Sequence, residues 1–190
     1  MLKSKMSILT GIVHRIRGCL NIDSIRQIYL SLIYPHLIYC CSLWGGACNT
    51  FLNKIFVAQK KLLRVMSYKH RYDHTHTIFK NLRLLKFPDI LQLQTYLFVH
   101  KSIYSFPVKC GFTATPRSAM TLRRTHDLLL PRCRTSHAKH SVLSRGTKAW
   151  NDLPNDLKLQ DNVNSFKCQL IKRIYTSYDK MYTYQGLYSL

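Results

Sequence analysis

The amino-acid sequence predicts a mainly α fold, and three observations support this. Apolar residues recur every three to four positions in several segments, as on one face of a helix. Capping residues precede these segments, and glycine or asparagine follows several of them. The 190 residues are 46% hydrophobic and 12% aromatic, enough for a core in one domain or two small ones. We expect a three-helix unit (1–68), a helical extension packed on it (69–106), a basic extended linker (107–139) and a short C-terminal helical segment with a frayed tail (140–190).

The first helix is expected from Met1 to Cys19. Gly18 and Asn21 mark its end. The basic residues of the segment lie largely off its apolar face, which is typical of a helix packed on one side. The inward stripe consists of Leu2, Met6, Leu9, Val13 and Ile16.

The second helix is expected to be capped by residues 23–24, to bend at Pro35 and to end at the Gly-Gly pair 45–46. Its middle is uncharged, apolar and rich in Tyr and Cys. Such a segment is expected in the interior, where Tyr39 is buried and Trp44 closes the end of the helix.

The third helix is expected from Phe51 to about Tyr68, with residues 49–50 as its cap. Its apolar residues follow helical spacing closely, so one face is expected to be buried. That face consists of Leu52, Ile55, Phe56, Gln59, Leu62, Leu63 and Met66.

The other face of this third helix is cationic. Lys54 and Lys61 are seven residues apart, Lys60 and Arg64 are four apart, and no acidic residue interrupts them. Without acidic partners the face gains no stabilising ion pairs along the helix. These four residues are therefore the first candidates for contacts to phosphate groups, although a simply solvated face remains the alternative.

Further helices are expected near Thr75, at 90–104, around 146–150 and at 166–178. The helix at 90–104 is apolar on most sides and should be buried. The linker at 107–139 contains prolines and is strongly basic. Its candidate nucleic-acid contacts are Arg117, Arg123, Arg124, Arg132 and Arg134.

The charge of the chain points to an anionic partner. Lys and Arg number 29 against 8 acidic residues, all Asp, for a formal net charge of +21. RNA or DNA is the expected partner, with an anionic membrane surface as the alternative. A membrane span between Arg26 and Lys54 is disfavoured, because the stretch holds Pro35 and several polar residues. The 7 scattered Cys and the absence of a signal peptide favour an intracellular protein, nuclear or cytoplasmic and not secreted.

No catalytic or metal site is predicted. His70, His74 and His76 have no close Cys pair, so a loop and helix cap is the preferred interpretation. The adjacent Cys40 and Cys41 are expected to fill space in a helix. No carboxylate pair follows a strand and no glycine-rich phosphate loop is present. We therefore expect no cofactor and no enzymatic activity of this chain alone.

Four blocks in order resemble one family over roughly residues 8–175. They are "SIRQIYLSLIYPHLIYCCSLWGG", "LNKIFVAQKKLLRVMSY", "HTHTIFKNLRLLKFPDILQLQTYLF" and "SRGTKAWNDLPNDLKLQDNVNSFKCQLIKRIY". Together they resemble the C-terminal part of the polyprotein of non-LTR (LINE-like) retrotransposons, of the jockey/CR1-type reverse transcriptases. The residues that carry the resemblance are Tyr29, Leu32, Ile33, Pro35, Tyr39, Trp44, Gly45, Gln59, Lys60, Arg64, His74, Phe79, Trp150, Asn151, Leu153, Pro154, Phe166 and Lys167.

The resemblance implies that the first three helices form a thumb-like bundle, which would follow the polymerase palm and grip the template–product duplex. It also implies that Lys54, Lys60, Lys61 and Arg64 contact phosphates. The palm and fingers of such a polymerase, with their catalytic Asp residues, are not expected in this chain and are a possible partner. Two other classes stay open: a helical interaction protein or non-functional remnant, and a membrane-surface protein. The sequence does not specify the oligomeric state.

Overall fold

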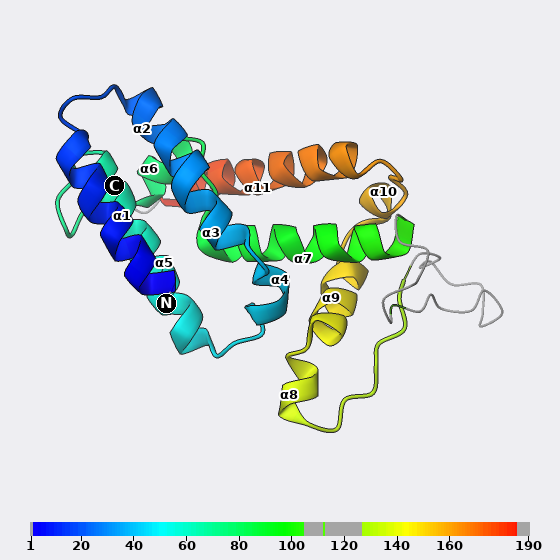
Figure 1. Cartoon of the computed structure of the whole chain (residues 1–190). Helices are drawn as coiled ribbons and strands as arrows, with labels where there is room; N and C mark the ends of the chain where they lie inside the picture. Colours follow the sequence, from blue (N-terminus) through cyan, green and yellow to red (C-terminus); the bar gives the residue numbers. More distant parts are fainter. Residues whose placement is uncertain (1, 105–111, 113–126, 186–190) are drawn as a thin grey trace. The chain divides into compact units, whose positions relative to one another are not determined.

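The structure, a computed structural model, describes residues 2–104, 112 and 127–185, with side chains up to Tyr178 (Figure 1). The secondary structure of these residues is helical and contains no sheet, so the predicted mainly α class is confirmed. The chain divides into two compact units, and each is described by itself. Unit 1 comprises Met1–Cys41 and Ala47–Leu91, and unit 2 comprises Ser42–Gly46 and Gln92–Leu190.

Unit 1 is built around the pairing of its two long helices. Helix α1 (Leu2–Ile16) packs along α5 (Asn49–Met66). Their predicted stripes face inward: Met6 and Val13 of α1 and Leu62 of α5 are at most 2% exposed. A third short helix, α6 (His76–Asn81), adds Ile78 and Phe79 to the core.

Gln59 joins three parts of the interior of unit 1. Its Nε2 donates to Tyr29 Oη at 2.8 Å and to the carbonyl of Leu85 at 3.0 Å. Its Oε1 accepts a hydrogen bond from the backbone N–H of Phe87 at 2.8 Å. Burial raises the pKa of the Tyr29 phenol, so this hydroxyl stays protonated. The one polar residue of the predicted stripe therefore satisfies buried groups that would otherwise lack partners.

The predicted second helix is broken into short pieces. Its N-cap is Asn21, whose side chain accepts from the N–H of Ile22 at 2.6 Å, and not residues 23–24. A π-helical turn precedes Pro35, whose missing N–H and bulky ring disturb a regular α-helix, so the predicted distortion is present. Cys40, with φ of 49°, then ends the helical run. The pieces are α2 (Ile22–Ile28), η1 (Tyr29–Ile33), α3 (Tyr34–Ile38) and α4 (Cys41–Trp44).

The prediction that the 32–44 stretch is an inner helix is wrong in part. Tyr39 is 76% exposed and Leu32 is 47% exposed, whereas Leu37 and Cys41 are buried. Trp44 is only half-buried, so it does not close a helix end as a fully buried plug. Buried residues recur every four positions along the segment from Ile25 to Leu37, so only one face of it is inward and Tyr39 lies on the other face.

Unit 2 holds the rest of the described helices. The long α7 (Phe87–Tyr104) begins in unit 1, and its later part belongs to unit 2. As predicted, α7 is buried on most sides. The last helix continues to Gln185, seven residues beyond the predicted end at Tyr178. The remaining helices are α8 (Ser136–Lys139), α9 (Val142–Asn151), α10 (Asn155–Lys158) and α11 (Val163–Gln185).

The core of unit 2 is an aromatic cluster around a buried histidine. The ring of His100 stacks on Phe166 with centroids 4.4 Å apart and lies 6.2 Å from that of Trp150. Its Nε2 is 2.5 Å from the carbonyl oxygen of Gln160. Burial lowers the pKa of His100, so its neutral form is favoured in the folded unit.

The segment Ser42–Gly46 is far from α9 in sequence, and Arg145 of α9 binds it through hydrogen bonds. Arg145 donates from its two terminal nitrogens to the carbonyls of Gly45 and Ser42, at 2.8 and 2.7 Å. Gly46 lies against the backbone of His140, and a Cβ at this position would overlap the His140 carbonyl oxygen. The second glycine of the pair is therefore needed for close backbone approach.

Candidate functional site

The four cationic residues predicted on the third helix do not share one site. Lys54 and Lys61 are exposed, and Lys60 and Arg64 are half-buried. The structure places Lys61 and Arg64 around one hollow, whereas Lys60 turns toward Phe56, with Nζ 4.1 Å from the ring centroid. Lys54 remains an exposed cation on the same helix, outside that hollow.

The chain returns past α5 because of the way this helix ends. Tyr68 has φ of 52°, in the left-handed region that favours glycine, and the N–H of Lys69 donates back to the carbonyl of Arg64 at 2.9 Å. The hydroxyl of Tyr68 donates to the carbonyl of Arg17 at 2.6 Å, and the Arg17 guanidinium lies 4.4 Å from the centre of its ring. These contacts to the end of α1 offset the cost of a left-handed conformation in a non-glycine residue.

The turn after α5 carries two further cations back beside the helix. Arg64 Nε donates to the carbonyl of Asp73 at 3.0 Å, which holds the loop against α5. The Asp73 carboxylate accepts from the N–H of His70 at 2.8 Å, so this nearby acid caps the loop. The resulting hollow has a volume of about 440 Å³. We name it the basic hollow; its lining residues are Val57, Lys61, Arg64, Val65, Lys69 and Arg71.

A second hollow of about 270 Å³ adjoins the basic hollow along the α1–α5 pair. The two share Lys61 and Val65 in their linings, so they are neighbours on the surface of unit 1. The other lining residues of the second hollow are small or polar and include Thr10, Gly11 and His14 of α1.

Lys60 belongs to a different cationic group. Burial lowers the pKa of Lys86, and Lys60 lowers it further, while Asp89 opposes them. Burial, Lys86 and Lys80 together lower the pKa of His76. Positive charge on Lys60 and Lys80 therefore disfavours the protonated forms of Lys86 and His76, respectively. The predicted Lys60 is therefore grouped with Lys80 of α6 and Lys86 after it. We name these three residues of unit 1 the second basic cluster.

The predicted arginines of the linker are only partly described. Arg132 and Arg134 are exposed, in the extended segment before α8. Arg117, Arg123 and Arg124 lie outside the described residues. The sequence prediction missed Lys69 and Arg71. Their return to α5 depends on the left-handed turn at Tyr68, and such a turn is not expected at a residue other than glycine. Only their closeness in sequence to Arg64 could have suggested them.

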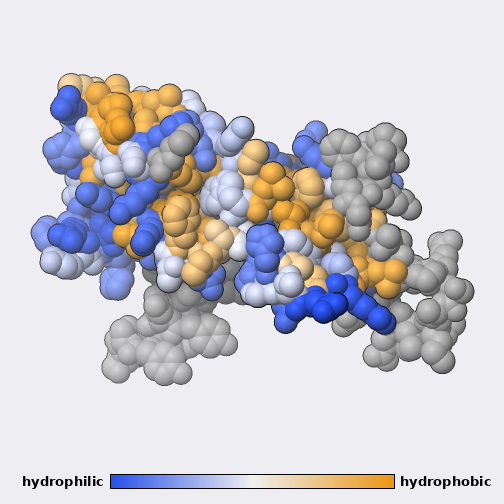
Figure 2. Space-filling model, turned by 60° about the horizontal axis from the view of Figure 1, so that its bottom comes forward, coloured by the Kyte–Doolittle hydropathy of each residue, from blue (hydrophilic) through white to orange (hydrophobic). Residues whose placement is uncertain are grey.

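Two other kinds of site do not occur in the part of the chain that the structure describes. None of its helices combines the length and the apolar character that crossing a bilayer requires. No three His, Cys, Asp or Glu side chains in the same part come together as a set of metal ligands. Apolar side chains are nevertheless visible among hydrophilic ones on the face drawn in Figure 2.

The fold and the basic hollow define a mainly helical protein with a concentrated cationic site. The chain is similar to the RNA-directed DNA polymerase from mobile element jockey of Drosophila funebris. The two are 33% identical over an alignment of 125 residues, which covers 60% of this chain. The matched part is 14% of that polymerase, so the chain spans only a small part of its relative. No family model and no solved structure matches the chain. The similarity relates this chain to a region of a retrotransposon reverse transcriptase.

Proposed function

We propose that the chain is a nucleic-acid-binding region of a retrotransposon RNA-directed DNA polymerase, and that it holds backbone phosphates in the basic hollow. The observation that carries the proposal is that Lys61, Arg64, Lys69 and Arg71 line one hollow, whose lining includes no acidic side chain. Such a set attracts a phosphate backbone with little dependence on base sequence.

The cations of the basic hollow suit this role by their exposure. Lys61, Lys69 and Arg71 are exposed and can reach phosphates while their aliphatic parts rest on the protein. Arg64 is held by its bond to the Asp73 carbonyl, so it presents its charge at a fixed place. The neighbouring hollow, lined by Thr10 and Gly11, would give a nucleic-acid strand a path along the α1–α5 pair.

The similarity to the jockey polymerase supports the further proposal that unit 1 acts as a thumb-like element. In this role it would grip template and product, while catalytic carboxylates come from a palm that this chain does not supply. The exposed Arg132 and Arg134 would add phosphate contacts. Lys54 would extend the contact along α5, whereas Lys60 would contribute through the second basic cluster.

A matched pair of variants tests the proposal. Lys61→Gln, Lys69→Gln and Arg71→Gln are combined, and binding to a fluorescent single-stranded oligonucleotide is measured by anisotropy. The affinity should fall at least about tenfold at moderate salt, and the salt slope should become shallower by roughly two to three. Arg64 is left unchanged in this variant, because its hydrogen bond to the Asp73 carbonyl also holds the loop against α5.

The control removes the same charge from exposed positions of unit 2, as Lys148→Gln, Lys167→Gln and Arg173→Gln. A smaller loss of affinity in the control supports the basic hollow as the site. Equal losses in both variants would mean that net charge alone drives binding, which contradicts the proposal.

A role as a helical interaction protein is a second candidate, favoured by one observation. Ile8 and Ile12 lie four residues apart on α1 and are 64% and 44% exposed. An apolar pair at this spacing suits a partner helix. Ile8→Ser with Ile12→Ser should then abolish self-association in gel filtration while nucleic-acid affinity is kept. A monomeric wild-type chain would contradict self-association through this pair.

A further inference from the structure

We propose that a pocket beside the basic hollow receives an unpaired base of the bound strand. The inference rests on the proposed function and adds a base-binding subsite to it. Lys69 lines both cavities, so a nucleotide whose phosphate meets Lys69 from one side has its base next to the second cavity. We name this cavity the mixed pocket.

The mixed pocket has the size and lining that a flat heterocycle requires. Its volume is about 310 Å³, within the range usual for small-molecule sites. Most of its lining is apolar, and Ile25, Met66 and Ile78 are at most 4% exposed. Unstacked bases are commonly held between aromatic or apolar side chains. The apolar residues are Leu20, Ile22, Ile25, Met66, Ile78 and Leu82.

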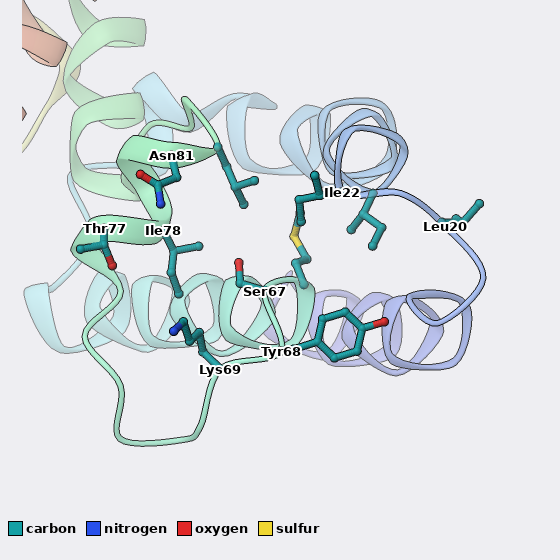
Figure 3. Close-up of a pocket in the computed structure, with 11 residues that line it drawn as sticks. Leu20, Ile22, Ser67, Tyr68, Lys69, Thr77, Ile78 and Asn81 are labelled. Carbon is teal, nitrogen blue, oxygen red and sulfur yellow. The ribbon is translucent and has the colours of Figure 1, made fainter.

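Polar groups are also available at the mixed pocket to meet the edge of a base. Ser67, Thr77 and Asn81 belong to its lining, together with Lys69 and Tyr68. In Figure 3 the Ser67 hydroxyl and the Asn81 amide nitrogen point toward the space between α5 and α6. An amide and hydroxyls can both donate and accept, as base edges require.

Tyr68 is not the platform on which the base stacks. Its ring points away from Ser67 and Asn81 in Figure 3, and its hydroxyl donates a hydrogen bond to the carbonyl of Arg17. The base is instead held by aliphatic side chains and the thioether of Met66. Lys69 supplies the charge complementarity that selects a nucleotide over a neutral apolar ligand.

The experiment compares two oligomers with equal phosphate content. One is an oligothymidylate of about ten nucleotides, and the other has the same length with tetrahydrofuran abasic residues. Wild type should bind the base-bearing oligomer about tenfold more tightly. The pocket variant Thr77→Val with Asn81→Leu removes polar groups that meet the edge of the base, and should lower this ratio at least about threefold while leaving affinity for the abasic oligomer unchanged. Both positions are exposed, so the variant is expected to fold.

A matched control places the same substitutions on α11, as Thr176→Val with Asn164→Leu, and should keep the wild-type ratio. A pocket variant that also keeps the wild-type ratio would overturn the inference. Equal affinities of wild type for both oligomers would overturn it too, while the proposed phosphate contacts would stand. No binding of either oligomer by wild type would overturn the proposed function as well.

Discussion

Lys158 Nζ lies 2.7 Å from Asp127 Oδ1, although Lys158 is only 1% exposed. The same ammonium group donates to the carbonyl of Asn151 at 3.1 Å. One cation of this basic chain is therefore a buried structural group. The pair joins Asp127 to the last residue of α10, over 31 positions of sequence.

Asp127→Ala should destabilise unit 2 by about 3–5 kcal/mol, because it leaves the Lys158 charge buried without its partner. Urea unfolding followed by tryptophan fluorescence measures this, since both tryptophans, Trp44 and Trp150, belong to unit 2. The double variant Asp127→Leu with Lys158→Met should recover most of the loss. An unchanged unfolding midpoint for Asp127→Ala would show that the pair does not stabilise the unit.

Gln59→Leu should destabilise unit 1 by about 3 kcal/mol, because Tyr29, Leu85 and Phe87 each lose a buried hydrogen-bond partner. Circular dichroism during urea unfolding gives the loss. Gln27→Leu, on the exposed face of α2, is the matched control and should change stability little. Equal midpoints for the two variants would contradict the network.

Gly46→Ala should cost unit 2 about 1–3 kcal/mol, because the added methyl group meets the carbonyl of His140. Gly18→Ala is the control, since a Cβ at Gly18 meets no atom within 4 Å. Urea unfolding followed by circular dichroism, which reports on the helices of both units, should show a lower midpoint for the first variant alone. A wild-type midpoint for Gly46→Ala would mean that the two backbones are not in close contact.

Acid should destabilise unit 2 through His100. Burial lowers its pKa in the folded unit, so the unfolded chain binds the proton more readily. The stability due to this group is complete above the unfolded pKa of about 6.5 and is lost as the pH falls toward the folded pKa. The urea midpoint by tryptophan fluorescence should therefore be lower at about pH 5 than at pH 7.5. His100→Gln should weaken this pH dependence, and an equal dependence in the variant would contradict the assignment.

The long amphipathic helices could be predicted from the sequence, because apolar residues at helical spacing mark the face that a helix buries. The stripes of α1 and α5 and the inward positions Phe166, Leu170 and Tyr178 of α11 confirm this. The second predicted helix failed because the left-handed conformation at Cys40 has no signal in residue type. Tyr39 is exposed because the segment before Cys40 is amphipathic, with buried residues at every fourth position, whereas the prediction placed the whole segment inside.

The candidate site could be predicted only in part for a similar reason. Lys61 and Arg64 are on the predicted cationic face, because helical spacing fixes their direction. Lys69 and Arg71 reach the same hollow through the left-handed turn at Tyr68, which rests on tertiary contacts to Arg17. Local periodicity does not describe such contacts. The predicted domain boundaries stay predictions.

The salt dependence of nucleic-acid affinity tests the central claim most directly. Anisotropy titrations of a duplex oligonucleotide from low to moderate salt give the slope of log affinity against log salt concentration. With roughly five phosphates neutralised, we predict a slope of about −4 to −5. An affinity that stays flat across the same range would contradict phosphate recognition by this chain.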